Sequence, residues 1–302
     1  MMRKNKTKEG NGMLKRLICI LMGCMVICGA AGACAEGEIR GYDPEAGYVY
    51  VTFGRYPQSI DGGIPDDGQQ AWKWRTLHQS FYKAKENKGK EYDPGELTPE
   101  PILWRVLEAD GEKVFLMSEY ILFSAPLHGD RKEFVTFGGD FTKTDLWKTL
   151  NGEFLTTAFT EAEASLLTER EGLGRVFIPS AEEVKDPALG FEKDRSVNGQ
   201  KANEKTKAWA TEYAIRVTHA YVYPITRRNH SPYWLRDPAT KKNHGRCTKN
   251  YGQIGTYDCQ NREEGARPEI WLAPDGFEIE SGSGTREDPY AIRPKTGEEA
   301  QP

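Results

Sequence analysis

The clearest alternation of apolar and polar positions lies just after the first third of the chain. Two apolar runs, 102–108 and 113–118, flank the dipeptide Asp110-Gly111. Asp-Gly tolerates the positive φ angles of a tight primed turn, whose twist matches that of two antiparallel strands. The pattern predicts a β-hairpin, and its period of two places Trp104 on the buried face.

The segment before this hairpin differs from it in composition. A β-branched and aromatic run at 48–53 predicts a first strand, which the turn-forming segment 54–57 ends. The chain then becomes polar over 58–101, with Gly-Gly, Asp-Asp-Gly and a lysine-rich run. We interpret 58–101 as a surface insertion that Trp72 and Trp74 pin to the rest of the domain.

Helical spacing appears in the middle of the chain. Four apolar residues recur at helical intervals after a Thr-Asp start: Leu146, Trp147, Leu150 and Phe154. Two capping boxes follow, each a Ser or Thr with a Glu three residues later: Thr160 with Glu163, and Ser180 with Glu183. Asn151-Gly152 marks a point of interruption in the first helix, and Pro187 limits the last one to a turn or two.

Short strands return in the last third, after a charged loop at 186–206. One short strand, 175–178, precedes the loop. The strands that follow it are bounded by turn-forming residues and lie at 233–235, 254–257, 269–272, 277–280 and 290–292. Helices gathered between hairpins favour an α+β fold, a single domain of mainly antiparallel short strands with a few central helices. We expect this domain at 47–273, followed by a C-terminal hairpin and a disordered tail at 274–302.

The N-terminus has the order of a secretory signal, with basic residues, an apolar run at 17–31 and then small residues. We expect a signal peptide at 1–35, with translation starting at Met1 or Met13, cleavage after Ala35 and a linker at 36–46. A second interpretation makes Cys34 a lipidated first residue, and a third retains the segment as a membrane anchor. The expected location is therefore outside the cytoplasm, secreted or at the cell surface.

Charge and cysteine content narrow the function classes. The leader contains 6 of the 41 Lys+Arg and 1 of the 45 Asp+Glu, so the remaining chain carries 35 minus 44, a formal charge of -9. Such an acidic chain without a basic stripe argues against a nucleic-acid partner. Cys247 and Cys259 are the two cysteines left after the leader, and in an oxidising compartment they predict a disulfide, with a pair of free thiols as the alternative.

Several blocks together resemble the family called the domain of unknown function numbered six-two-seven-three. They begin at Val51, Pro101, Leu146, Val176, Trp209, Tyr233 and Ala266, and read VTFGRYPQS, PILWRVLEADGEKVFLMSE, LWKTLNGEFLTTAFTEAE, VFIPSAEEV, WATEYA, YWLRDP and ARPEIWL. The resemblance implies a domain of secreted and surface proteins of Gram-positive anaerobes, and it implies no activity.

The final blocks also resemble C-type-lectin-like folds, including formylglycine-generating enzymes, and this likeness implies a fold alone. Two departures count against the functions of those proteins. Cys247 and Cys259 are too far apart in sequence to match the copper-binding cysteine pair, and the calcium-binding triplets of sugar-binding lectins are absent. We therefore expect no cofactor from this second resemblance.

Candidate chemistry is sparse in the sequence. No two of the five histidines have the spacing of a helical metal site, and no nucleophile elbow or phosphate-binding loop occurs, so we name no metal ligand and no catalytic residue. Arg105, Arg236 and Arg267 each lie beside an aromatic strand. A structural ion pair is the first interpretation, with Glu108, Glu119 or Glu269 as candidate partners. The alternative is a ligand site formed by Tyr233, Trp234, Arg236 and Arg267.

The leading functional hypothesis is a secreted or surface-attached, non-enzymatic module. Through the loops of its last third it would bind an extracellular glycan, peptide or protein. The alternatives are an extracellular hydrolase, whose paired acids a sequence cannot reveal, and a purely structural surface protein. Contact with a membrane is expected only through a lipid on Cys34 or an uncleaved N-terminal anchor.

Overall fold

The central hairpin has the predicted strands but not the predicted turn. The computed structural model describes residues 39–59, 68–90, 92–93, 95–197, 200–224, 230–249 and 251–295. Strands β2 (Thr98–Ala109) and β3 (Val114–Ser118) pair antiparallel. Gly111 has no positive φ, and the Asp110 carboxylate instead accepts hydrogen bonds from the backbone N–H groups of Glu112 and Lys113 at 2.8 Å. This side-chain cap replaces the primed turn, so the expected turn type was wrong.

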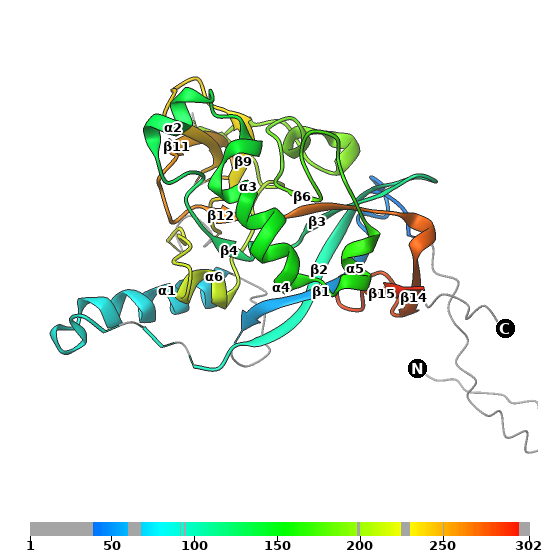
Figure 1. Ribbon diagram of the computed structural model, residues 1–302, viewed down its shortest axis with the longest axis horizontal. Helices are drawn as coiled ribbons and strands as arrows, with labels where there is room; N and C mark the ends of the chain where they lie inside the picture. Colours follow the sequence, from blue (N-terminus) through cyan, green and yellow to red (C-terminus); the bar gives the residue numbers. More distant parts are fainter. Residues whose placement is uncertain are drawn as a thin grey trace, which may run out of the picture. The chain divides into compact units, whose positions relative to one another are not determined.

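An eight-stranded sheet surrounds this hairpin (Figure 1). Its order is β14-β15-β1-β2-β3-β13-β5, and β6 also pairs with β13. The other strands of the sheet are β1 (Tyr50–Ser59), β5 (Leu167–Thr168), β6 (Val176–Phe177), β13 (Glu269–Leu272), β14 (Phe277–Ser281) and β15 (Tyr290–Pro294). Within the described ranges, β1 and β15 run parallel and the other pairs of this sheet antiparallel. The α+β prediction is confirmed.

The first strand continues past the point where the sequence pattern ended it. Gly54 adopts φ +67°, and the pairing of β1 with β2 shifts register between Thr52 and Arg55, so the glycine forms a β-bulge. A Cβ at Gly54 would lie 2.7 Å from the carbonyl oxygen of Ala158. The turn-forming residues therefore bend the strand without stopping it.

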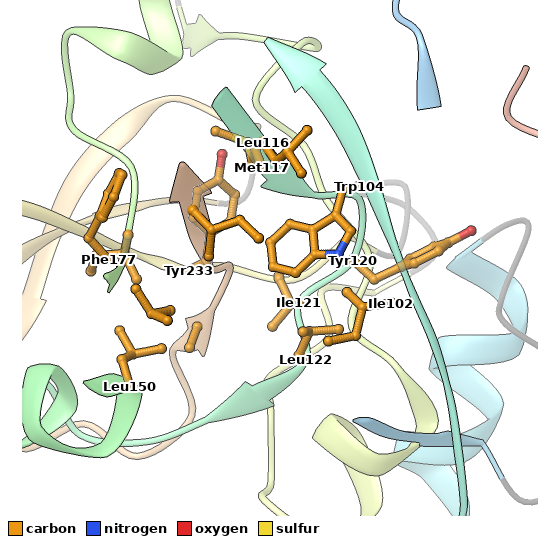
Figure 2. Packing of buried hydrophobic residues seen from close by; sticks show 14 of the residues in the cluster. Ile102, Trp104, Leu116, Met117, Tyr120, Ile121, Leu122, Leu150, Phe177 and Tyr233 are labelled. Atoms are coloured by element: carbon orange, nitrogen blue, oxygen red, sulfur yellow. The ribbon is translucent and has the colours of Figure 1, made fainter. Parts of the chain in front are cut away.

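Trp104 lies at the centre of the core, as its position in the hairpin predicts. Its side chain is fully buried, and its indole N–H donates to the carbonyl of Phe53 at 2.8 Å. Figure 2 shows it among Ile102, Leu116 and Ile121. The neighbouring positions of β2 are buried on both faces of the strand, because segments 121–123 and 158–159 belong to the same core.

The central helices follow the predicted signals. They are α2 (Arg131–Thr136), α3 (Asp145–Thr149), α4 (Leu155–Ala158), α5 (Glu161–Leu166) and α6 (Glu212–Arg216). Thr144 caps α3, and a π-helical turn at Leu150–Phe154 joins α3 to α4 at the expected interruption. Both capping boxes form, although the second starts only a 3₁₀ turn at Glu183–Lys185.

The predicted surface insertion contains a helix that the sequence analysis missed. Helix α1 (Gly68–Lys83) lies beside α6 (Figure 1). Ala71 and Trp74 are buried, Trp72 is half-buried, and the expected attachment of the insertion through its tryptophans is confirmed. A 3₁₀ turn at Lys85–Asn87 follows the helix.

Smaller sheets complete the fold. Strand β4 (Phe123–Ser124) pairs with β12 (Gly265–Ala266), and β7 (Arg195–Val197) with β8 (Gln200–Ala202) inside the expected loop. A three-stranded sheet has the order β11-β10-β9 and comprises β9 (Trp234–Pro238), β10 (His244–Thr248) and β11 (Ile254–Asp258).

The register of this small sheet overturns the predicted disulfide. Cys247 and Cys259 are both free and buried in the described part of the chain. Cys247 pairs with Gly255, and Cys259 lies four residues beyond that position. Four residues of strand span about 13 Å, whereas a disulfide needs Cα atoms within about 7 Å. The hairpin forms as expected, but its register keeps the thiols apart.

The expected signal peptide, the Ala35 cleavage site and Cys34 lie outside the described residues, as does the end of the expected tail. Within the described ranges, no helix is long and apolar enough to cross a membrane.

Candidate functional site

The four residues predicted to line a ligand site lie mostly in the core. Tyr233, Trp234 and Arg267 have no exposed surface, and the side chain of Arg236 is 12% exposed. The Tyr233 hydroxyl donates to the carbonyl of Thr206, and Figure 2 shows the ring within the hydrophobic cluster. The structure therefore places these side chains where they support the fold, with little surface for a ligand.

The first interpretation of the arginines, a structural ion pair, is confirmed for two of them. Arg105 Nε donates to Glu119 at 2.7 Å. Arg236 pairs with Glu269 at 3.3 Å and with Glu183 at 2.6 Å, a partner that the sequence did not suggest. Burial alone would raise the pKa of Glu183, but its hydrogen bonds and ion pair with Arg236 outweigh burial and lower it to about 2.

Arg267 differs from the other two arginines. Its Nε donates to the carbonyl of Ser118 at 2.8 Å, while its two terminal nitrogens have no hydrogen-bond partner among the described residues. The guanidinium carbon lies 5.5 Å from the centre of the Tyr233 ring. This contact orients Arg267 inside the core.

A groove between α1 and α6 is open to a ligand. Its volume is about 330 Å³, within the range typical of small-ligand sites. Its walls come from α1, from the segment at the end of α6, and from one residue of the last third: Arg75, His78, Gln79, Tyr82, Lys83, Ile215, His219, Ala220 and Glu263. The groove thus combines aromatic rings with charged groups of both signs.

Two histidines meet in the wall of this groove. His78 Nε2 lies 3.0 Å from His219 Nδ1, although the residues are 141 positions apart in sequence. His219 has φ +72°, the one positive value at a non-glycine residue in the described ranges. A side chain in the left-handed region costs about 1 to 2 kcal/mol, so packing around the end of α6 must hold it there.

The surroundings of His78 fix its ring and its charge. The rings of Tyr82 and Tyr92 meet it edge-on, with centroids 4.9 and 5.4 Å away. Burial, followed by the nearby His219, lowers the pKa of His78 to about 4. The imidazole is therefore neutral at pH 7, with one nitrogen able to accept.

Arg75 connects the helix to the last third of the chain. Its guanidinium carbon lies 4.0 Å from the centre of the Tyr221 ring, and its Nη2 lies 3.7 Å from Glu263 Oε1. The side chain of Glu263 is 49% exposed, so this ion pair is weak and its geometry is open to change. Arg75 thus anchors the floor of the groove.

Two further features lie outside the groove. A hollow of about 180 Å³ lies beside α2, lined by Val135, Gly138, Gly139, Ala239, Lys242 and His244. Near β11, Lys249 Nζ lies 2.9 Å from the centre of the Tyr257 ring, and Glu264 is buried. The hollow is smaller than the groove, and Glu264 has 1% of its surface exposed.

One wall of this groove, helix α1, has a signal in the sequence, whereas the pairing of its histidines has none. Ala71, Trp74, Arg75 and His78 recur at helical spacing, which identifies α1 and its buried face. The polar composition of 58–101 masked that spacing. No local pattern pairs His78 with His219, since only the folded chain brings them together.

Fold and groove together define an α+β protein with a polar, ring-lined groove between an added helix and the central domain. The chain belongs to the family described as Domain of unknown function (DUF6273), whose model matches residues 111–274. Helix α1 lies before the matched range, whereas α6 and Glu263 lie inside it. Comparisons with curated proteins and with solved structures returned no match. The C-type-lectin-like likeness therefore stays a prediction.

Proposed function

We propose that this protein is an exported, non-enzymatic binding module whose groove between α1 and α6 receives part of an extracellular glycan, peptide or protein. One observation carries the proposal: His78 and His219 meet at 3.0 Å in the wall of a groove of about 330 Å³. The backbone of His219 is held at a positive φ, and such outliers concentrate at functional sites.

The composition of the groove supports recognition of a polar ligand with a flat apolar face. Tyr82 has 49% of its surface exposed, and its ring lies at the rim beside His78. Aromatic rings of this kind stack against sugar rings or large side chains, while Arg75, Lys83 and Glu263 supply polar contacts. Export through the segment 1–35 would present the groove to ligands outside the cell.

Glycan and peptide arrays test this proposal. The protein is screened beside Tyr82→Ala, which removes the rim ring, and Leu77→Ala, its matched control. Leu77 is equally exposed on the same helix but does not line the groove. A ligand bound by the unaltered protein and by Leu77→Ala, and lost by Tyr82→Ala, supports the proposal. Absence of any binding above background, or equal binding by Tyr82→Ala, would sink it.

A further inference from the structure

The histidine pair in the groove has the geometry of two ligands on one cation. His78 Nε2 and His219 Nδ1 lie 3.0 Å apart. Their ring centroids are 4.8 Å apart, and both residues line the groove. Imidazole nitrogens are ordinary ligands for copper, nickel and zinc.

The separation of the nitrogens is compatible with one shared cation. Two bonds of about 2.1 Å place the nitrogens about 3.0 Å apart at a right angle and about 3.4 Å apart at a tetrahedral angle. The observed 3.0 Å is also the length of a hydrogen bond between the two rings, so the ligand type, and not this spacing, indicates the metal. For a nitrogen site, affinity among divalent first-row metals rises toward Ni²⁺ and Cu²⁺.

We propose that His78 and His219 bind a divalent transition-metal cation, Cu²⁺ or Ni²⁺, at the wall of the groove. In the cation-free pair, one ring donates its N–H to the other. On binding, that proton moves through solvent to the other nitrogen of its own ring, both imidazoles stay neutral, and two lone pairs face the cation.

The remaining positions around the cation would be filled from the groove. Among the described residues, no group of three or more His, Cys, Asp or Glu side chains could hold a metal ion, so the protein supplies two ligands and water or a bound molecule supplies the rest. A cation with coordination positions that the protein does not fill can exchange ligands, whereas a structural metal site has all its positions filled by the protein. The inference goes beyond the proposed function, because cation binding is measured without any other ligand.

Thermal unfolding of the full chain with NiCl₂ or CuCl₂ tests the site. At a tenfold excess over the dissociation constant, either cation should raise the midpoint by about 3 to 6 °C. The rise should vanish in His78→Gln and in His219→Gly, and persist in His244→Gln, a control for nonspecific histidine binding. Glycine suits the left-handed backbone at position 219, so His219→Gly should fold. No rise in the unaltered protein, or an equal rise in both groove variants, would overturn the proposal.

Electron paramagnetic resonance of the Cu²⁺-loaded protein gives a second readout. Hyperfine structure from two nitrogens supports the pair, and a signal from a single nitrogen contradicts it. Array binding with EDTA present tests the proposed function separately. The two proposals are therefore tested separately. Cation binding can be absent while array binding persists, and array binding can be absent while cation binding persists.

Discussion

At the scale of single residues, a buried acid makes the stability of the protein depend on pH. Glu264 is 1% exposed, and its Oε1 accepts from Asn261 Nδ2 at 3.2 Å. Its Oε2 has no partner within the described ranges. Burial, opposed by Lys249, raises the pKa of this carboxyl to about 8. The protein therefore holds a neutral acid in its interior at neutral pH.

This raised pKa predicts a loss of stability with rising pH. A group protonated more strongly in the folded state contributes its stability fully below the unfolded pKa, near 4.5, and loses it as pH rises through about 8. Urea midpoints should fall between pH 5 and pH 9. The fall should shrink in Glu264→Gln, which stays neutral, and remain in Glu263→Gln, the exposed neighbour. If the urea midpoint of Glu264→Gln fell with pH as steeply as that of the unaltered protein, the raised pKa of Glu264 would not explain the fall.

Arg236 bonds two carboxyl groups, those of the half-buried Glu183 and the fully buried Glu269, so its removal should be costly. Arg236→Ala would leave Glu183 and the fully buried Glu269 without this partner. Breaking a buried pair from one side typically costs about 3 to 5 kcal/mol. We expect a loss of that size in the free energy of unfolding, measured by denaturant titration. Arg246→Ala, at a surface position of β10, is the control and should change little. A loss below 1 kcal/mol would contradict the structural role.

At the scale of elements, the hairpin of β2 and β3 contributes the central side chain of the core, Trp104. Trp104→Ala should destabilise the protein by about 3 to 5 kcal/mol, because the indole is fully buried and its N–H bonds Phe53. Trp72→Ala, at a half-buried position of α1, is the control and should cost less. Equal melting temperatures for Trp104→Ala and the unaltered protein would show the core assignment to be wrong.

The register of β10 and β11 predicts the state of the cysteines. Thiol titration of the denatured, unreduced protein should give two more reactive thiols than the double variant Cys247→Ser with Cys259→Ser, because four residues of strand separate the pair. In the folded protein both thiols should be inert, since burial raises the pKa of each. Equal thiol counts for the two denatured proteins would show that Cys247 and Cys259 form a disulfide.

The sequence predicted these elements where the signals were local. The hairpin and the Thr160 capping box depend on residues a few positions apart, so pattern and structure agree. Gly54 shows the limit: its turn propensity was correct, but pairing with β2 turned a stop into a bulge. Register and long-range pairs have no local signal, so the cysteine separation and the meeting of His78 with His219 required the folded chain.

At the scale of the whole molecule, export is the expectation on which the proposed function depends. N-terminal sequencing of protein recovered from the medium should begin at Glu36, because Ala33 and Ala35 place small side chains at the expected cleavage site. Ala35→Pro should block processing, whereas Gly37→Ala should leave it intact. A lipid-blocked Cys34 would replace secretion with surface anchoring, and an intact leader would contradict both.

The parallel pairing of β1 with β15 constrains the order in which the molecule can be completed. Val51 lies opposite Tyr290, and the family match ends well before that partner, at residue 274. One edge of β1 therefore stays unpaired until the chain has been synthesised or translocated past β15. Contacts this distant in sequence close slowly, and an open strand edge can pair with another chain in the meantime. Strand β15 thus completes the sheet late, and the range that the family model matches, residues 111–274, is narrower than the sheet that β1 and β15 complete.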